Sequence, residues 1–435
     1  MKTSDLNFES VFFVTTIALQ INRSHPFIKR NIFWGFQFLA ILTLSVLSIF
    51  LLTNSVLMYD IPEGRFTDAS KNGTMAIVAI TISAKFSFML YYQHFIKSLI
   101  EIVNKDYIIS ESFEADERDI VEAYSKKGSK ISMYWLISAT MTSLIFPLKA
   151  FYQMAQSYWA GEFQFVPFFD LRYPDRMDVL KNTPVFFWIY FNLCTLFGIY
   201  ATTMYIGFDP LVPIFLMHVC GQLNILIKRM ETIFDENSST EEVNEKLKQI
   251  NLKLQELYGM TENIQTKFTV LFEFNLKTTT FLLPLAILLT SFVYYLQDLG
   301  KRSINLEFIS FFIASILHFY IPCYYSDKLM DQSENLREAI YSCGWEKNPD
   351  PRARKSILIM LTRTTAPLVL STVFYPICLD TFADVSFGSL SENASTFLSD
   401  KDSSVHIIPM WRQHRCEPVF AIFLKNIHYL RSLVT

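Results

Sequence analysis

The chain has 435 residues, of which 51% are hydrophobic and 18% are charged, and it contains 41 Phe but only 12 Gly. Soluble domains carry about 25% charged residues and about 7% Gly, so this composition indicates a protein that resides in lipid. The formal net charge of −3 gives neither the basic field of a nucleic-acid-binding protein nor an acidic tail. Nucleic acid is therefore excluded as a partner.

Long apolar segments predict membrane helices, because a helix needs about 20 apolar residues to cross the hydrocarbon and irregular backbone cannot face lipid. Lys85 lies near the middle of the second segment, where we expect it to pair with a carboxylate or carbonyl inside the bundle rather than to extend along its own helix to a polar cavity. The predicted fold class is all-α: a polytopic membrane protein with seven transmembrane helices. The seven segments are Phe33–Thr53, Gly73–Leu99, Ile131–Phe151, Val185–Gly207, Leu271–Gln297, Leu306–Ser326 and Ile357–Phe382.

The distribution of Lys and Arg predicts the orientation, because positive residues are retained in the cytosol. The N-terminal segment and the second, fourth and sixth connections hold 21 of these residues, whereas the other three connections hold 7. We therefore expect a cytosolic N-terminus and an extracellular C-terminus, which excludes the G-protein-coupled receptors. The short apolar stretch Val11–Ile21 is expected to be an amphipathic helix on the inner membrane surface.

The connection after the fourth span, residues 221–270, is predicted to be a cytosolic helical anchor. Apolar residues at alternating spacings of four and three form a heptad stripe along its second half. The stripe is either the seam between two cytosolic helices or a surface for subunit assembly, and we favour assembly. Its residues are Val243, Leu247, Ile250, Leu254 and Leu257.

The sequence contains no motif of a catalytic or metal centre. It lacks a Gly-rich phosphate loop, an HExxH motif, a GxSxG motif and any CxxC pair, and His218 and His318 each stand alone in apolar sequence. We therefore expect neither an enzyme nor a cofactor or metal site.

Two blocks of the sequence resemble insect odorant receptors. Residues 209–230, DPLVPIFLMHVCGQLNILIKRM, are similar to the exit of that family's fourth helix, and residues 339–382 are similar to its sixth connection and seventh helix. The matching positions in the second block are Ala339, Tyr341, Trp345, Arg354, Lys355, Pro367, Leu379 and Phe382. The weaker part of the resemblance extends over residues 1–385.

The resemblance implies a multi-pass plasma-membrane protein, the odorant-binding subunit of a heteromeric odorant-gated cation channel in olfactory sensory neurons. Its partners would be a small volatile odorant and a co-receptor subunit, assembled as a hetero-tetramer. The expected organisation is a seven-helix odorant-receptor domain over residues 1–385 and an atypical polar tail over residues 386–435, where the family has a pore-lining helix. A secondary transporter of a small apolar molecule and a truncated, non-conducting receptor variant are the alternatives.

An odorant pocket is expected in the outer halves of the helices, where aromatic and aliphatic side chains recur at helical spacing. Burial of apolar surface would supply most of the affinity, and one hydrogen bond from Tyr152 or Tyr190 would orient the ligand. The same stripes are typical of helix–helix packing. The predicted ligand-binding residues are Ile82, Phe86, Phe151, Tyr152, Phe187, Tyr190, Phe191, Phe311 and Phe312.

Overall fold

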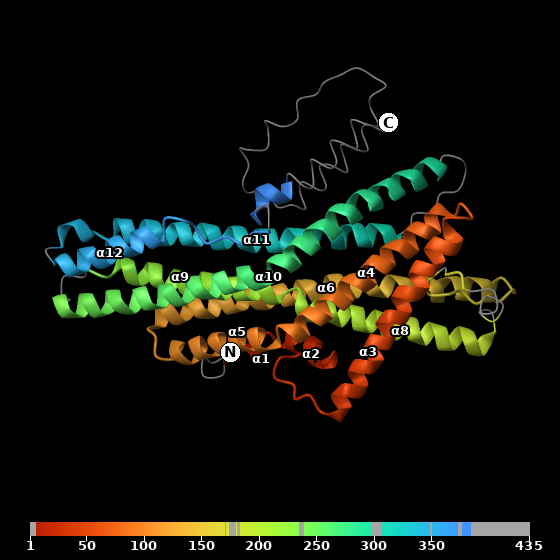
Figure 1. Cartoon of the computed structure of the whole chain (residues 1–435), viewed down its shortest axis with the longest axis horizontal. Coiled ribbons are helices and arrows are strands. Elements are labelled where there is room, and N and C mark those ends of the chain that lie inside the picture. The colour runs from red at the N-terminus through yellow and green to blue at the C-terminus, as the bar shows by residue number, and fades with distance from the viewer. Residues whose placement is uncertain are drawn as a thin grey trace, which may run out of the picture. The chain divides into compact units, whose positions relative to one another are not determined.

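The computed structural model describes residues 6–169, 171–173, 180, 183–234, 239–297, 306–348, 350–372 and 376–383, with no side chains described for residues 67, 275–297, 306–309, 311 and 312. The regular elements of these residues are helices, which confirms the predicted all-α fold class (Figure 1). They are α1 (Phe8–Val11), α2 (Phe13–Ile21), α3 (Ile32–Asn54), the π-helical turn η2 (Ser55–Asp60), α4 (Phe66–Tyr91), α5 (Gln93–Ser110), α6 (Ala115–Trp159), α8 (Pro184–Phe208), α9 (Leu211–Glu231), α10 (Thr240–Gln297), α11 (Leu306–Ser342), the 3-10 turn η3 (Trp345–Lys347) and α12 (Pro351–Arg363).

Four helical segments of the described residues are long and apolar enough to cross a membrane: Ile32–Asp60, Asp68–Tyr91, Ala115–Trp159 and Pro184–Glu231. They differ in their surroundings. In the first segment, only 11% of the most apolar stretch of 18 residues is buried. The helix α3 therefore presents most of its side chains outward, as a lipid-facing helix does. In the fourth segment, which consists of α8 and α9, 89% of the corresponding 18-residue stretch is buried. This helix pair is therefore the centre of the packing.

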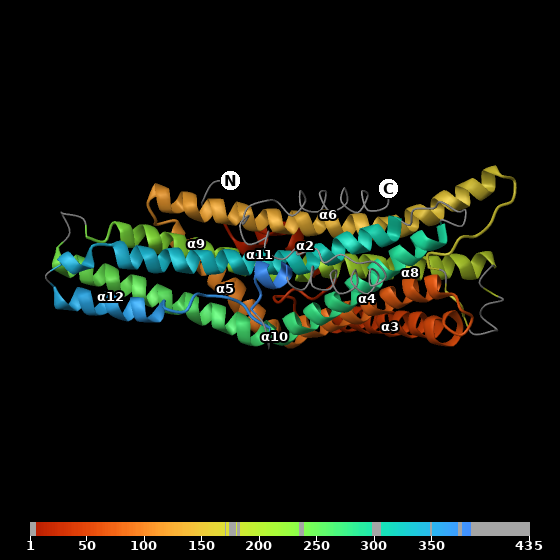
Figure 2. The same cartoon turned by 90° about the horizontal axis from the view of Figure 1, so that it is seen from above.

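The pair α8–α9 is bent where Asp209 and Pro210 lie between the two helices. Proline has no backbone N–H to continue the hydrogen-bond ladder, so α8 ends at Phe208 and α9 begins at Leu211. Beyond the bend, α9 packs against α6, α10 and α11, while α8 packs against α2, α4 and α6 (Figures 1 and 2). The bend leaves the carboxylate of Asp209 inside the bundle.

The last expected span, Ile357–Phe382, is not a continuous helix in the structure. The helix α12 ends at Arg363, because Pro367 lacks a backbone N–H and restricts the preceding residue. Side chains of α11 then bind the extended backbone that follows: Ser333 Oγ accepts from the N–H of Leu368, and Ser326 Oγ accepts from the N–H of Leu370. The prediction of one continuous helix from the apolar length of this segment is therefore wrong.

The other expected spans correspond to helices with different limits. The second is divided at Tyr92 into α4 and α5, and the third is the central part of α6, which is 45 residues long. The fifth and sixth lie within α10 and α11. The polar tail, residues 386–435, lies outside the described residues.

We expected the N-terminal stretch to lie on the membrane surface. In the structure it also packs into the helix bundle. α2 packs along α8, with Thr15 and Leu19 fully buried, while Phe13, Ile17 and Ile21 are exposed on its other face. Close contact requires Gly207 of α8, because a Cβ atom there would stand 2.9 Å from the Leu19 side chain and 3.2 Å from its backbone nitrogen. The exposed face retains the apolar character expected at a membrane surface.

The heptad stripe of α10 lies in the chain's own core. Val243, Leu247, Ile250, Leu254 and Leu257 are all buried, and α10 packs against α9, α11 and α12. These helices lie side by side at one end of the described unit (Figures 1 and 2). The stripe is therefore a seam between helices of one chain, and these five side chains leave no free surface for a second subunit.

Candidate functional site

A cavity of about 150 Å³ lies among α4, α6, α8 and α11, together with the loop that precedes α8. We call it the main cavity. Most of its lining is apolar, with scattered hydroxyl groups. The lining residues are Thr74, Met75, Val78, Thr81, Trp135, Ser138, Ala139, Thr142, Ser143, Phe146, Phe168, Phe169, Phe197, Gly198, Ala201, Thr202, Tyr205, Ala314, Ser315 and His318.

The main cavity exists because small residues face one another across the bundle. Ala139, Gly198, Ala201 and Ala314 contribute almost no side-chain volume at positions where four helices meet. Folded interiors are otherwise close-packed, with few voids larger than a water molecule. A space of this size in apolar surroundings is comparable to an engineered protein cavity of about 150 Å³ that binds benzene, so it suits a small apolar guest.

A buried charge cluster adjoins the main cavity. Lys85 Nζ of α4 lies 2.7 and 2.9 Å from the two carboxylate oxygens of Asp209, and 2.8 Å from His318 Nε2 of α11. The side chain of Lys85 is 0% exposed and that of Asp209 is 7% exposed. The ring of Tyr205 lies against the ammonium at 4.3 Å. Lys85 is thus paired with a carboxylate inside the bundle, as the sequence analysis favoured.

The predicted aromatic residues of α8 lie beside the main cavity and do not line it. Phe187 and Phe191 are buried in a separate apolar cluster with Phe168 and Met154. Tyr190 lines a smaller cavity of about 40 Å³ between α3 and α8. Their role in ligand binding stays a prediction, and it points to this neighbouring region.

The remaining predicted ligand residues are dispersed. Ile82 and Phe86 of α4 are buried, and the ring of Phe86 stacks on Phe38 and meets Tyr200 edge-on. Phe151 and Tyr152 of α6 are 48% and 62% exposed, respectively. The side chains of residues 311 and 312 lie outside the described residues. The structure therefore does not bring the seven predicted residues with described side chains into one pocket.

The sequence analysis missed Trp135 and the small polar residues that line the main cavity. Two signals could have identified them: hydroxyl residues at four-residue spacing inside an apolar helix, as at Ser138 and Thr142, and the small residues Gly198 and Ala201 within one turn of α8. We gave weight to aromatic stripes, which fill space instead of leaving it.

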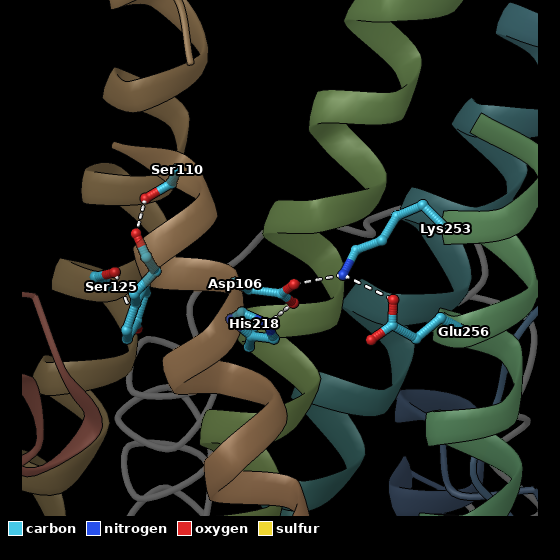
Figure 3. Close-up of polar contacts among 7 residues, drawn as sticks. Asp106, Ser110, Ser125, His218, Lys253 and Glu256 are labelled. Atoms are coloured by element: carbon cyan, nitrogen blue, oxygen red, sulfur yellow. Dashed lines mark hydrogen bonds and ion pairs between the residues drawn. The ribbon is translucent and has the colours of Figure 1, made fainter. Parts of the chain in front are cut away.

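A second polar cluster lies between α5, α9 and α10 (Figure 3), with Asp106 and Lys253 outside the four apolar segments and His218 within the fourth. Asp106 lies between two partners, with His218 Nε2 at 2.8 Å and Lys253 Nζ at 2.5 Å, and Lys253 also reaches Glu256 at 3.3 Å. Burial alone would raise the pKa of Asp106, but the hydrogen bond and charge of His218, followed by the charge of Lys253, outweigh it and lower the pKa below its ordinary value.

This second cluster has the geometry of a structural link. Each oxygen of Asp106 is occupied by one partner, and the three residues come from three different helices. No group of three side chains suited to hold a metal ion occurs among the residues that the structure describes. The cluster joins α5, α9 and α10.

Comparison with solved structures shows the fold. Two structures of the insect olfactory receptor OR5 from Machilis hrabei, one of them in complex with eugenol, align with this chain at a TM-score of 0.70 each. The alignments cover 90% of this chain and 98% or 97% of the OR5 chain, at 14% and 15% sequence identity. The chain is thus an all-α, multi-pass membrane protein with the fold of an insect olfactory receptor.

Sequence comparison then gives the family. The profile described as 7tm Odorant receptor matches residues 65–388. Odorant receptor 10a of Drosophila melanogaster is 20% identical over 283 residues, covering 62% of this chain and 67% of the relative. Odorant receptor 2a of the same fly is 30% identical over 95 residues, or 22% of this chain and 23% of the relative. The chain belongs to the 7tm odorant receptor family, which is a receptor family and not an enzyme family.

Proposed function

We propose that this chain is the odorant-binding subunit of a heteromeric, odorant-gated cation channel, and that the odorant occupies the main cavity. The observation that carries the proposal is the cavity of about 150 Å³ at the meeting point of α4, α6, α8 and α11. Family membership and the fold shared with OR5, which was solved in complex with eugenol, support a small organic ligand.

The lining of the main cavity suits a volatile molecule. Apolar surface gains about 25 cal/mol per Å² on burial, so a ligand of about six to ten carbon atoms derives most of its affinity from contact with the walls. Drug-sized ligands occupy pockets of about 300–1,000 Å³, which is well above the volume of the main cavity. The cavity therefore favours small odorants over larger metabolites.

The channel is a hetero-tetramer with a shared co-receptor in the plasma membrane of olfactory sensory neurons, with the N-terminus of this chain in the cytosol and its C-terminus outside. The resemblance of residues 209–230 and 339–382 to insect odorant receptors and the excess of Lys and Arg in alternate connections support this arrangement. Because the heptad stripe of α10 is buried, contacts between subunits would use the exposed faces of α10 and α12, which include Leu252, Leu358 and Ile359. An odorant opens the channel only if it binds the open state more tightly than the closed state.

The test replaces one small lining residue. The variant Ala201→Phe fills the main cavity from α8, and Ile199→Phe is the matched control, because Ile199 lies on the outward face of the same helix. Each variant is co-expressed with an insect co-receptor subunit, and currents evoked by eugenol and a panel of small ketones, esters and phenols are recorded. We expect the currents to disappear in Ala201→Phe and to persist in Ile199→Phe. Unchanged currents in Ala201→Phe would contradict the proposal.

Two further experiments determine where the ligand binds and whether binding leads to a current. The variant Tyr190→Ala tests the neighbouring cavity between α3 and α8, and loss of the response in this variant alone would move the ligand there. Thermal stabilisation of the purified full-length chain by the same compounds reports binding without current. Binding with no current in the co-expressed complex would identify a non-conducting receptor variant, and uptake of ligand without current would identify a transporter.

A further inference from the structure

Trp135 lines the main cavity, and its indole N–H is a buried donor. Trp135 is 4% exposed, and among the residues that the structure describes its Nε1 atom has no hydrogen-bond partner. Buried polar groups are nearly always paired, because an unmade hydrogen bond in apolar surroundings costs free energy. A ligand atom that accepts a hydrogen bond would recover this cost, whereas a hydrocarbon would leave it in place.

Most threonine hydroxyl groups around the cavity are already engaged. Thr74, Thr81, Thr142 and Thr202 each donate to the backbone carbonyl four residues earlier in their own helices, at 2.7–2.9 Å. Their oxygen lone pairs remain able to accept, but their protons are committed to the helices. The indole N–H therefore differs from these hydroxyl groups in having no partner among the described residues.

The charge cluster holds His318 beside Trp135. The ammonium of Lys85 has three protons, and three acceptors lie around it: the two oxygens of Asp209 at 2.7 and 2.9 Å and His318 Nε2 at 2.8 Å. Because an ammonium can only donate, Nε2 accepts, and the neutral imidazole carries its proton on Nδ1. His318 lines the main cavity and meets the Trp135 ring edge-on, with 5.7 Å between the ring centres.

We infer that the main cavity selects small apolar ligands that carry a hydrogen-bond-acceptor oxygen, such as ketones, esters, aldehydes and ethers, and that Trp135 is the residue that determines this specificity. The indole N–H donates to the ligand oxygen. His318 is a positioning residue: Lys85 donates to its Nε2, and its ring meets the Trp135 ring edge-on. The inference rests on the proposed function, because it assumes that the main cavity holds the ligand.

The experiment compares ligands of equal shape. The ketone 2-heptanone and the alkene 2-methyl-1-heptene differ only in the replacement of the carbonyl oxygen by a methylene group. Their affinities are measured by thermal stabilisation of the purified full-length receptor in lipid nanodiscs. We expect the ketone to bind about tenfold more tightly to the native chain, which is the effect of satisfying one buried donor. In Trp135→Phe the ratio falls to about one, while the affinity for the alkene is unchanged.

The matched control is Trp188→Phe. Trp188 is half-exposed on α8, does not line the main cavity and belongs to the same residue type, so the ketone preference should survive there. If the role of Trp135 were purely structural, its replacement would lower the affinity for both ligands equally. The ratio of the two affinities would then stay the same. If Trp135→Phe does not fold, the ratio of affinities measured on the native chain still decides whether the cavity prefers ligands with an acceptor oxygen.

The experiment distinguishes failure of this inference from failure of the proposed function. Equal affinity of the native chain for ketone and alkene overturns the inference and leaves the proposed function standing. Absence of binding by either compound, and by homologous pairs with shorter and longer carbon chains, overturns the proposed function and the inference with it. A ketone preference that persists in Trp135→Phe removes this residue from the role assigned to it.

Discussion

Replacing Asp209 with a neutral residue measures how much the charge cluster contributes to the free energy of unfolding. Lys85 is fully buried, and the carboxylate of Asp209 accepts two of its three protons. Breaking a buried ion pair by removing one partner typically costs about 3–5 kcal/mol, because the other charge is left without compensation. We expect Asp209→Leu and Lys85→Met each to lower the free energy of unfolding by about this amount.

The double variant separates this effect from simple loss of packing. Replacing both members of a buried pair with apolar residues of similar volume is often neutral or stabilising. Lys85→Met combined with Asp209→Leu should therefore be more stable than either single variant, by about 3 kcal/mol, although His318 loses both partners. As a control, Lys97 and Glu101 form an ion pair at 3.7 Å with side chains 42% and 56% exposed, and Lys97→Met should change stability by less than about 1 kcal/mol.

The measurement is unfolding of the purified full-length chain in detergent, followed by tryptophan fluorescence, for the native chain and the four variants. A double-mutant cycle gives the coupling between the two positions. Additive losses, with the double variant less stable than either single variant, would refute the reasoning. Loss of less than about 1 kcal/mol in each single variant would do the same, because it would show that Lys85 is not desolvated.

Two further variants test packing and titration. Gly207→Ala should destabilise the fold by about 1–3 kcal/mol, because the new methyl group meets Leu19 of α2, whereas Gly259→Ala in the open part of α10 should stabilise it by up to about 1 kcal/mol; equal shifts in the thermal midpoint would contradict the packing argument. The folded-state pKa of Asp106 lies below its unfolded value of 3.8, so its stabilisation is present above about pH 4 and disappears as the pH falls through the folded pKa. Asp106→Asn should lower stability at neutral pH and flatten the acid limb of the stability–pH curve, and an unchanged limb would contradict the assignment.

The sequence predicted the elements that depend on local composition. The length of the apolar segments predicted the helices that are long enough to cross a membrane. The heptad spacing in α10 predicted a face that packs against another helix. The partner of that seam was not predictable, because a stripe on one helix is the same whether it meets its own chain or another. The end of α12 was also missed, because Pro367 stops the helix while the apolar composition continues to Phe382.

The candidate site was less predictable for a geometric reason. The main cavity depends on which small residues of three distant helices, α6, α8 and α11, meet at one place, and this is tertiary information. Large aromatic side chains such as Phe187 and Phe191 fill space and so mark where a cavity is absent. Lys85 could be expected to have a buried partner, but its partner, Asp209, is 124 residues away in the sequence.

The main cavity and a second one share two residues, which suggests how binding could reach the rest of the chain. Trp135 and His318 line both the main cavity and a cavity of about 40 Å³ on the other side of the charge cluster. The second cavity is bordered by Leu271 of α10 and by Ile377, which lies in the segment after α12. This cavity is much smaller than the main cavity and offers free space into which side chains can move.

A ligand that displaces Trp135 or His318 would therefore press against the segment that contains Ile377. Filling the second cavity with Ile377→Phe should leave ligand affinity within about twofold, because the walls of the main cavity are untouched, and should reduce the evoked current, because the shift between states needs that space. Affinity is measured by thermal stabilisation and current by recording with a co-receptor. If affinity and current fell together, the two cavities would belong to one binding site, and transmission through the shared side chains would be refuted.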